Sequence, residues 1–212
     1  MHPKHHIVIT APELNVPAEG QWISALLRLG IGKVHIRKPQ AAADEIARLL
    51  ENIPRTLRHR CILSEHSDLV RQYHLGGLHL SVKSWQSLTH RPELSDDQTL
   101  SVSCHSVEEL QKLPFLPDYA YLSPIADSLS KPGYGHNTWT TAELQHICAQ
   151  SPCPLVALGG IQPSNANHFL HLGFTAVASL GYWQGLSIHQ LEGAVHQMCS
   201  PRLLLCGGID PT

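Results

Sequence analysis

The sequence has no marked surplus of charge of either sign. Its 212 residues hold 15 Lys and Arg against 17 Asp and Glu, a formal net charge of −2 with histidine neutral. Because non-specific binding to nucleic acid or to an anionic membrane needs a strongly basic surface, this balance argues against both as partners. A ligand recognised through its charge must therefore meet a local cluster of side chains.

Long apolar runs and closely spaced cysteine pairs are also lacking. The apolar stretch in MHPKHHIVIT is too short for a signal-peptide core or a membrane span, so we expect a cytoplasmic protein. The six cysteines form no CxxC pair and none of the close spacings of a zinc site, which favours free thiols. The sixteen histidines are scattered and form no metal-binding tract.

Short β-type runs alternate with longer amphipathic segments along the whole chain. Eight runs rich in β-branched residues or leucine are strand candidates: HIVITA, KVHIR, CILSE, GLHLS, LSVSCHS, YAYLSPI, PLVALGG and AVASLG. A segment with apolar residues at three- and four-residue spacing follows each of them. Ser106 and Ser164 stand where two such helices would begin, and Gly30 and Gly173 where two would end.

This alternation predicts an α/β fold, a single-domain (β/α)8 TIM barrel. The barrel would occupy about residues 5–198 of 1–212, with a short C-terminal tail, since no linker divides the repeating units. An open, doubly wound sheet is the alternative. Its first turn would more usually carry a glycine-rich fingerprint, which TAPELNVP lacks.

In such a barrel the functional groups follow the carboxyl ends of the strands. Gly159 and Gly160 follow the seventh strand, and Gly181 ends the eighth. Residues without a β-carbon let backbone N–H groups come close to an oxyanion, and the loops after these two strands often hold phosphate. The glycines therefore favour a phosphate site, while tight turns alone would be the simpler explanation.

Other strand ends carry polar side chains. On the second strand, His35 and Arg37 share a face, and Lys38 begins the loop that follows. On the fifth strand, Ser103 and His105 share a face. An unpaired charge inside a barrel is costly, so Arg37 indicates either a ligand or a core carboxylate as its partner.

Two further groups of residues allow two interpretations each. Ser128, Ser130 and Lys131, in the loop ADSLSKPGYG after the sixth strand, combine hydroxyl donors with a cation, which suits a pyrophosphate but also an ordinary solvated loop. His79 and His105 lie near strand ends. Each of them could be an acid–base group, or a core histidine bonded to the backbone.

Several of these motifs, in their order, resemble the thiamine phosphate synthase family and its sister group, the TenI-type thiazole tautomerases. The resemblance runs from about residue 5 to residue 195 through HIRKP, LSEHSDL, GGLHLS, SVSCHSVEEL, DYAYLSPIADSLSKPGYG, PLVALGGI and LGFTAVASLG. It implies a (β/α)8 barrel that joins hydroxymethylpyrimidine diphosphate to thiazole phosphate and releases pyrophosphate. Small phosphorylated substrates would then be the partners, and a homo-oligomer is an open alternative to a monomer.

The resemblance also assigns roles to residues. It implies that the pyrimidine diphosphate lies against the second, fifth and sixth strand ends, and the thiazole phosphate against backbone amides after the seventh and eighth. The catalytic candidates are Arg37, Ser103 and Lys131. The substrate-binding candidates are His35, Lys38, His79, His105, Ser128, Ser130, Gly159, Gly160, Leu180 and Gly181.

The metal site that the resemblance implies is only partly present. The synthases have Asn-Asp after the third strand where this chain has Ser64 and Glu65, and an aspartate where it has Ser84. Magnesium prefers carboxylates together with phosphate oxygens, so Glu65 is the one candidate metal ligand. We expect Mg²⁺ binding to be weakened.

Two more departures concern the substrates. The synthases have the pattern Gln-x-Arg-x-Lys on the second strand. At the same positions this chain has His35, Arg37 and Pro39, and its lysine, Lys38, stands one position earlier. The catalytic histidine of the tautomerases falls on Pro124, which cannot exchange a proton. Three hypotheses follow: a divergent synthase, which the Ser-x-Ser-Lys loop favours, a thiazole tautomerase, or a non-catalytic binder of thiazole or thiamine phosphate.

Overall fold

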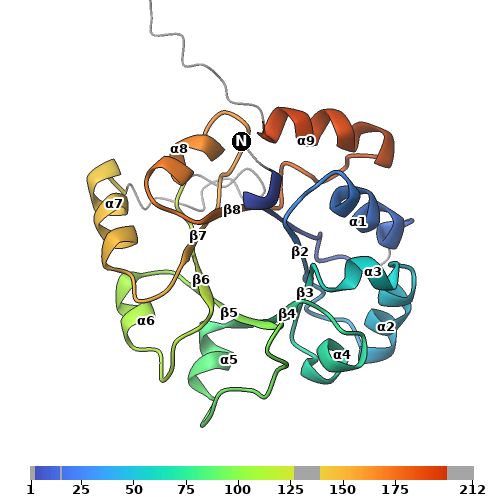
Figure 1. Ribbon diagram of the computed structural model, residues 1–212, viewed down its shortest axis with the longest axis horizontal. Coiled ribbons are helices and arrows are strands. Elements are labelled where there is room, and N and C mark those ends of the chain that lie inside the picture. The colour runs from blue at the N-terminus through green and yellow to red at the C-terminus, as the bar shows by residue number, and fades with distance from the viewer. Residues whose placement is uncertain (1–2, 15, 127–138, 200–212) are drawn as a thin grey trace, which may run out of the picture.

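Eight parallel strands close into a barrel in the computed structural model, which confirms the predicted (β/α)8 fold (Figure 1). Each strand pairs with the next along the chain, and β8 pairs with β1. The structure describes residues 3–14, 16–126 and 139–199. All eight predicted strands are present: β1 (His6–Ile9), β2 (Lys33–Ile36), β3 (Cys61–Ser64), β4 (Gly77–Ser81), β5 (Thr99–Cys104), β6 (Tyr119–Leu122), β7 (Leu155–Leu158) and β8 (Ala176–Ser179).

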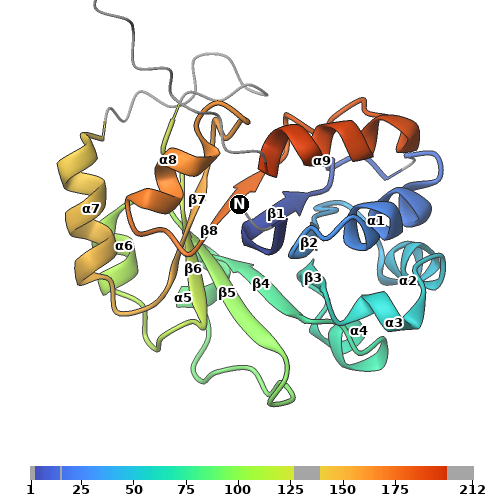
Figure 2. The ribbon, with the colours of Figure 1, turned by 45° about the horizontal axis from the view of Figure 1, so that its top comes forward.

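Helices surround the barrel and cover the outer face of the strands (Figures 1 and 2). Their bounds are α1 (Glu19–Arg28), α2 (Ala43–Glu51), α3 (Arg55–Arg58), α4 (Ser67–Gln72), α5 (Val82–Gln86), α6 (Val107–Gln111), α7 (Thr141–Gln150), α8 (Ala166–His171) and α9 (Leu191–Cys199), with 3-10 turns η1 (Pro3–His5) and η2 (Ile188–Gln190). The sequence pattern did not predict the short helix α3. Helix α9 packs against α1, so the last helix closes the ring onto the first.

Local signals set several helix ends. The Ser106 hydroxyl accepts a hydrogen bond of 3.2 Å from the Glu109 N–H, so Ser106 caps α6 as predicted. Gly30 and Gly173 follow α1 and α8 with φ of 99° and 109°, a conformation that favours glycine. Helix α8 begins after Asn165, so the predicted start at Ser164 was wrong by one residue.

The main core lies between the strands and the helices. Outward-facing strand residues such as Val34, Val102 and Val177 are at most 1 % exposed, and they belong to one apolar cluster with Leu26 and Trp85 of the helices. Burial of each such side chain contributes about 1.5–3 kcal/mol relative to exposure. This layer of buried side chains stabilises the barrel, and loops form its two poles.

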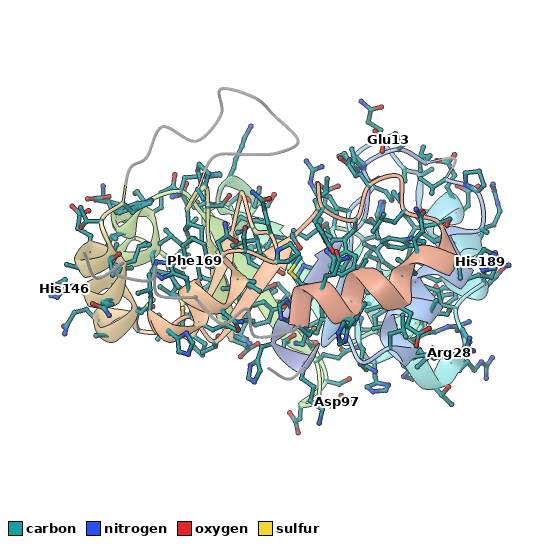
Figure 3. All side chains as sticks on the ribbon, turned by 90° about the horizontal axis from the view of Figure 1, so that it is seen from above. Glu13, Arg28, Asp97, His146, Phe169 and His189 are labelled. Carbon is teal, nitrogen blue, oxygen red and sulfur yellow. The ribbon has the colours of Figure 1, made fainter. Side chains whose placement is uncertain are left out.

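The two poles are distinct surfaces. Figure 3 shows Glu13, in the loop after β1, at the pole opposite Asp97, which precedes β5. Because all strands are parallel, every loop that follows a strand lies at the first pole, here called the carboxyl pole, and the other is called the amino pole. No helix in the described part of the chain is long and apolar enough to cross a membrane. The five cysteines described are free thiols, as predicted.

Candidate active site

Polar side chains fill much of the barrel interior beneath the carboxyl pole. The strand register places His79 opposite Ser101, and Ser103 opposite Tyr121, on the inward-facing side. Branched apolar residues usually dominate this position in TIM barrels. The polar interior departs from this usual pattern, and it lies directly under the pole where the functional residues were expected.

His79 occupies the centre of this polar cluster. Its Nδ1 shares a hydrogen bond of 2.9 Å with Ser101 Oγ, and its Nε2 shares one of 2.8 Å with Ser103 Oγ. Burial, and then the charge of Arg37, lower the pKa of His79 to about 3, so the ring is neutral near pH 7. The imidazole fixes the hydroxyl of Ser103, a predicted catalytic residue, at the inner rim.

Arg37 stands at the rim directly after β2. Its backbone N–H donates to Thr10 Oγ1 at 3.1 Å, which holds the start of the loop, while its side chain is exposed. The positive charge of Arg37 contributes to the lowered pKa of His79. His79 and Ser103 come together from two strands, and Arg37 follows β2 at the same pole. The roles of these residues toward a substrate remain predictions.

His35 lies deeper than predicted. It is 2 % exposed, and its Nε2 meets the hydroxyls of Tyr119 at 3.0 Å and Tyr121 at 2.9 Å. Burial raises the pKa of Tyr119 to about 12 and lowers that of His35 well below its usual value, so these groups form a neutral network. His35 forms the floor beneath His79, with the two rings 5.2 Å apart, and its contact with substrate remains a prediction.

Lys38 is not available at the rim. Its Nζ donates to the Ala11 carbonyl at 2.7 Å, to the Glu13 carbonyl at 2.6 Å and to Glu19 Oε1 at 2.8 Å, and the side chain is 1 % exposed. The prediction that Lys38 binds substrate has no support from these contacts and stays a prediction. Three acceptors take its three donors, so Lys38 ties the loop after β1 to the start of α1.

His105 lies on the rim after β5 and bonds to the backbone. Its Nδ1 meets the carbonyl oxygen of Ser123 at 2.8 Å, and its own N–H donates to Glu109 Oε2 at 2.6 Å. Of the two interpretations of this histidine, the structure matches the one with a backbone partner. His105 joins the loops after β5 and β6, and its role toward a substrate remains a prediction.

The loop after β7 has the form expected of an anion site. Gly159 and Gly160 have φ of 102° and 64°, and a Cβ on Gly159 would stand 3.0 Å from Cα of Pro124. Among the described residues, the backbone N–H groups of Gly159, Gly160 and Gly181 donate to no protein acceptor. Donors of this kind in a left-handed turn are suited to bind phosphate oxygens.

A residue that the sequence did not suggest holds this loop. Asn165 Nδ2 donates to the Gly160 carbonyl at 2.9 Å, and its Oδ1 accepts from the Gln162 N–H at 2.9 Å. An asparagine directly before an amphipathic segment is the signal that could have identified it. On the neighbouring strand, Leu180 packs with the apolar side chains inside the barrel, next to Gly181.

The residues that the structure describes do not form a magnesium site on their own. Glu65 is an exposed carboxylate after β3, and Ser84 lies in the first turn of α5 with its hydroxyl 2.9 Å from that of Ser81. Among the described residues, no group of three histidine, cysteine, aspartate or glutamate side chains could hold a metal ion. Since magnesium needs about six oxygen ligands, one carboxylate is insufficient without a ligand that brings its own.

Three of the predicted site residues, Ser128, Ser130 and Lys131, lie outside the described residues. The structure therefore neither places them at the mouth nor removes them from it.

An eight-stranded parallel barrel with polar groups gathered at its carboxyl pole is the architecture of a TIM-barrel enzyme. The family model described as thiamine monophosphate synthase matches residues 6–181, and the chain belongs to this family. The resemblance seen in the sequence motifs is thereby confirmed.

Individual relatives agree with this assignment. The thiamine-phosphate synthase of Chlamydia caviae is 24% identical over 181 residues, which cover 82% of this chain and 85% of the relative. That of Lysinibacillus sphaericus is 29% identical and covers 72% of this chain and 74% of its own. A thiamine phosphate pyrophosphorylase from Bacteroides thetaiotaomicron has a similar structure, with a TM-score of 0.71, 28% identity and coverage of 91% and 94%.

Proposed function

We propose that this chain is a thiamine phosphate synthase that joins hydroxymethylpyrimidine diphosphate to thiazole phosphate. The observation that carries the proposal is the pairing, at one pole, of a cation-and-hydroxyl cluster with a glycine loop whose N–H groups donate to no acceptor in the part of the chain that the structure describes. The first suits a diphosphate and the second a monophosphate. The family to which the chain belongs gives the same assignment.

In the proposed reaction, the bond between the pyrimidine methylene carbon and the diphosphate oxygen breaks, and its electron pair leaves with pyrophosphate. The lone pair of the thiazole nitrogen then forms the new carbon–nitrogen bond. The catalytic task of the protein is to stabilise charge that builds up on the leaving group. Arg37 would supply a fixed positive charge for it, and Ser103, held by His79, a hydroxyl donor.

The remaining residues would orient the two substrates. The N–H groups of Gly159, Gly160 and Gly181 would bind the thiazole phosphate, with Asn165 fixing the loop. Ser128, Ser130 and Lys131 stay candidates for the diphosphate on the strength of the motif. Mg²⁺ would depend on oxygens of the diphosphate to complete its ligands beside Glu65, and none of the steps above is routed through it.

The structure offers little support for the tautomerase alternative. Pro124 stands where that group has its catalytic histidine, and it packs against Gly159. His79, with a pKa of about 3, is a weak base near neutral pH. Pro124 has no group that exchanges a proton, and His105 stays the other acid–base candidate for this alternative.

The test is to incubate the purified protein with both precursors and magnesium and to follow pyrophosphate and thiamine phosphate. The proposal predicts that both products appear in equal amounts. Isomerised thiazole phosphate without pyrophosphate would show a tautomerase, and saturable binding without turnover would show a binding protein. Either of these two results would refute the proposal.

A further inference from the structure

A cavity opens at the amino pole, opposite the candidate active site. It has a volume of about 580 Å³, and its lining residues Gly32, Asp118, Pro154 and Thr175 all precede strands. This volume lies within the range of roughly 300–1,000 Å³ that small-molecule sites occupy. Nothing in the proposed synthase reaction uses this pole of the barrel.

Apolar side chains make the deep wall of this cavity. Ile7, Tyr119 and Val156 line it and belong to the apolar cluster inside the barrel, and Ala176 packs beside them. The cavity therefore reaches the lower end of the barrel interior. A ligand there would bury an apolar body against these residues, with a gain of about 25 cal/mol for each Å² removed from water.

One cation faces this apolar wall. Lys33 Nζ donates to Thr99 Oγ1 at 3.1 Å and lies 4.9 Å from the centre of the Tyr119 ring. Among the described residues, no carboxylate forms an ion pair with it. Burial lowers the pKa of Lys33, and the charge of Asp118 partly opposes this.

The other charged groups of the cavity already have partners. Asp118 Oδ2 accepts from the Leu100 N–H at 2.7 Å and from Arg91 at 2.6 Å. Arg60 donates to the carbonyl groups of Leu27, Ile31 and Gly32, and Lys4 has a partner of its own. Among the described residues, the lining thus holds three cations and one carboxylate, and that carboxylate accepts from groups outside the lining.

We propose that the amino-pole cavity is a binding site for a small molecule that combines an apolar body with one carboxylate, paired to Lys33. A single ammonium suits a single carboxylate, whereas a phosphate is usually held by several donors. The apolar wall selects against small, fully polar anions. This inference is independent of the synthase reaction, because it uses none of the residues at the carboxyl pole.

The experiment titrates sodium octanoate into the full-length protein by calorimetry and compares it with octanamide, which has the same shape without the charge. The proposal predicts saturable binding of octanoate that is roughly tenfold or more tighter than that of octanamide. Excess pyrophosphate, a probe for the other pole, should leave octanoate binding unchanged. This comparison needs no variant, so it stands even if a substitution disturbs folding.

Two variants test the location. Lys33→Met should weaken octanoate binding roughly tenfold while leaving octanamide binding nearly unchanged. Ala176→Phe should fill the cavity and weaken the binding of both compounds. Equal affinity for octanoate and octanamide, displacement by pyrophosphate, or a Lys33→Met variant that binds octanoate as tightly as the wild type would each overturn the proposal.

Discussion

At the scale of single residues, buried neutral histidines are the feature with the widest consequences. The pKa of His79 is lowered to about 3 and that of His6 to about 4, each mainly by burial. In the unfolded chain, histidine titrates near 6.5. Between these values the unfolded chain binds more protons than the folded one, so stability should be lost as the pH falls from about 6.5 toward 3.

This predicts a pH effect that depends on His79. In a His79→Asn variant, the free energy of unfolding should decline less steeply below pH 6.5, by up to about 1.4 kcal/mol per pH unit. Urea unfolding at pH 7, 6 and 5 measures the slope. His146→Asn, at an exposed position of α7, is the matched control and should keep the wild-type slope. An unchanged slope in His79→Asn would mean that His79 titrates normally in the folded protein.

Gly160 is the residue that tests the phosphate loop. With φ of 64°, Gly160→Ala should destabilise the fold by about 1 kcal/mol and also displace the N–H groups that would meet phosphate. Gly173→Ala is the control, because Gly173 has φ of 109° and ends α8, outside the phosphate loop. Both variants should lower the urea midpoint, but only Gly160→Ala should weaken thiazole phosphate binding in calorimetry. Equal affinities of the two variants for thiazole phosphate would show that this loop does not bind the phosphate.

At the scale of elements, the buried pair Lys38–Glu19 joins the end of β2 to the loop after β1 and the start of α1. Burial raises the pKa of Glu19, against the opposing effect of Lys38, and Glu19 Oε2 has no hydrogen-bond partner among the described residues. The Lys38 ammonium is therefore the main group that offsets the unfavourable free energy of burying the Glu19 carboxylate.

Removing that cation should be strongly destabilising. Lys38→Met would leave a buried, unpaired carboxylate and lower the free energy of unfolding by about 3 kcal/mol or more. Adding Glu19→Gln should restore much of this loss, because the remaining side chain is uncharged. Arg48→Met, which breaks an exposed pair with Asp44, should change stability little. Urea unfolding compares the variants, and a small effect of Lys38→Met would contradict the structural role given to this pair.

The elements themselves were largely predictable from the sequence. Strands such as Leu155–Leu158 are continuous apolar runs because helices cover one face and the barrel interior the other, and this pattern is visible without a structure. The four-residue helix α3 was missed because it has too few residues to show a helical period.

The sequence predicted which face of each strand carries the candidate site residues, but not how deeply their side chains are buried or which residues they contact. Alternation placed His35 and Arg37 on one side of β2, yet only the closed barrel shows that His35 lies under the mouth between two tyrosines. The same holds for Lys38, whose partner Glu19 precedes it by nineteen residues and meets it only through folding. Contacts of this kind depend on the packing of distant segments, which local patterns do not specify.

At the scale of the whole molecule, the barrel places two candidate sites at opposite poles. The carboxyl pole carries Arg37, Ser103 and the glycine loop, while the amino pole carries the cavity with Lys33. A polar network through Tyr119, His35 and His79 fills the interior between them. Under the proposed function, the carboxyl pole performs the synthase reaction.

The most direct test of that claim is the steady-state rate of thiamine phosphate formation in Arg37→Ala. Loss of a fixed charge aimed at the leaving group should lower kcat roughly 100-fold or more, and Arg37→Lys should recover part of it. Arg71→Ala, which removes an exposed cation paired with Asp68, should keep the wild-type rate. In Arg37→Ala the pKa of His79, followed by NMR, should also rise, since the repelling charge is gone. A wild-type rate in Arg37→Ala would contradict the account.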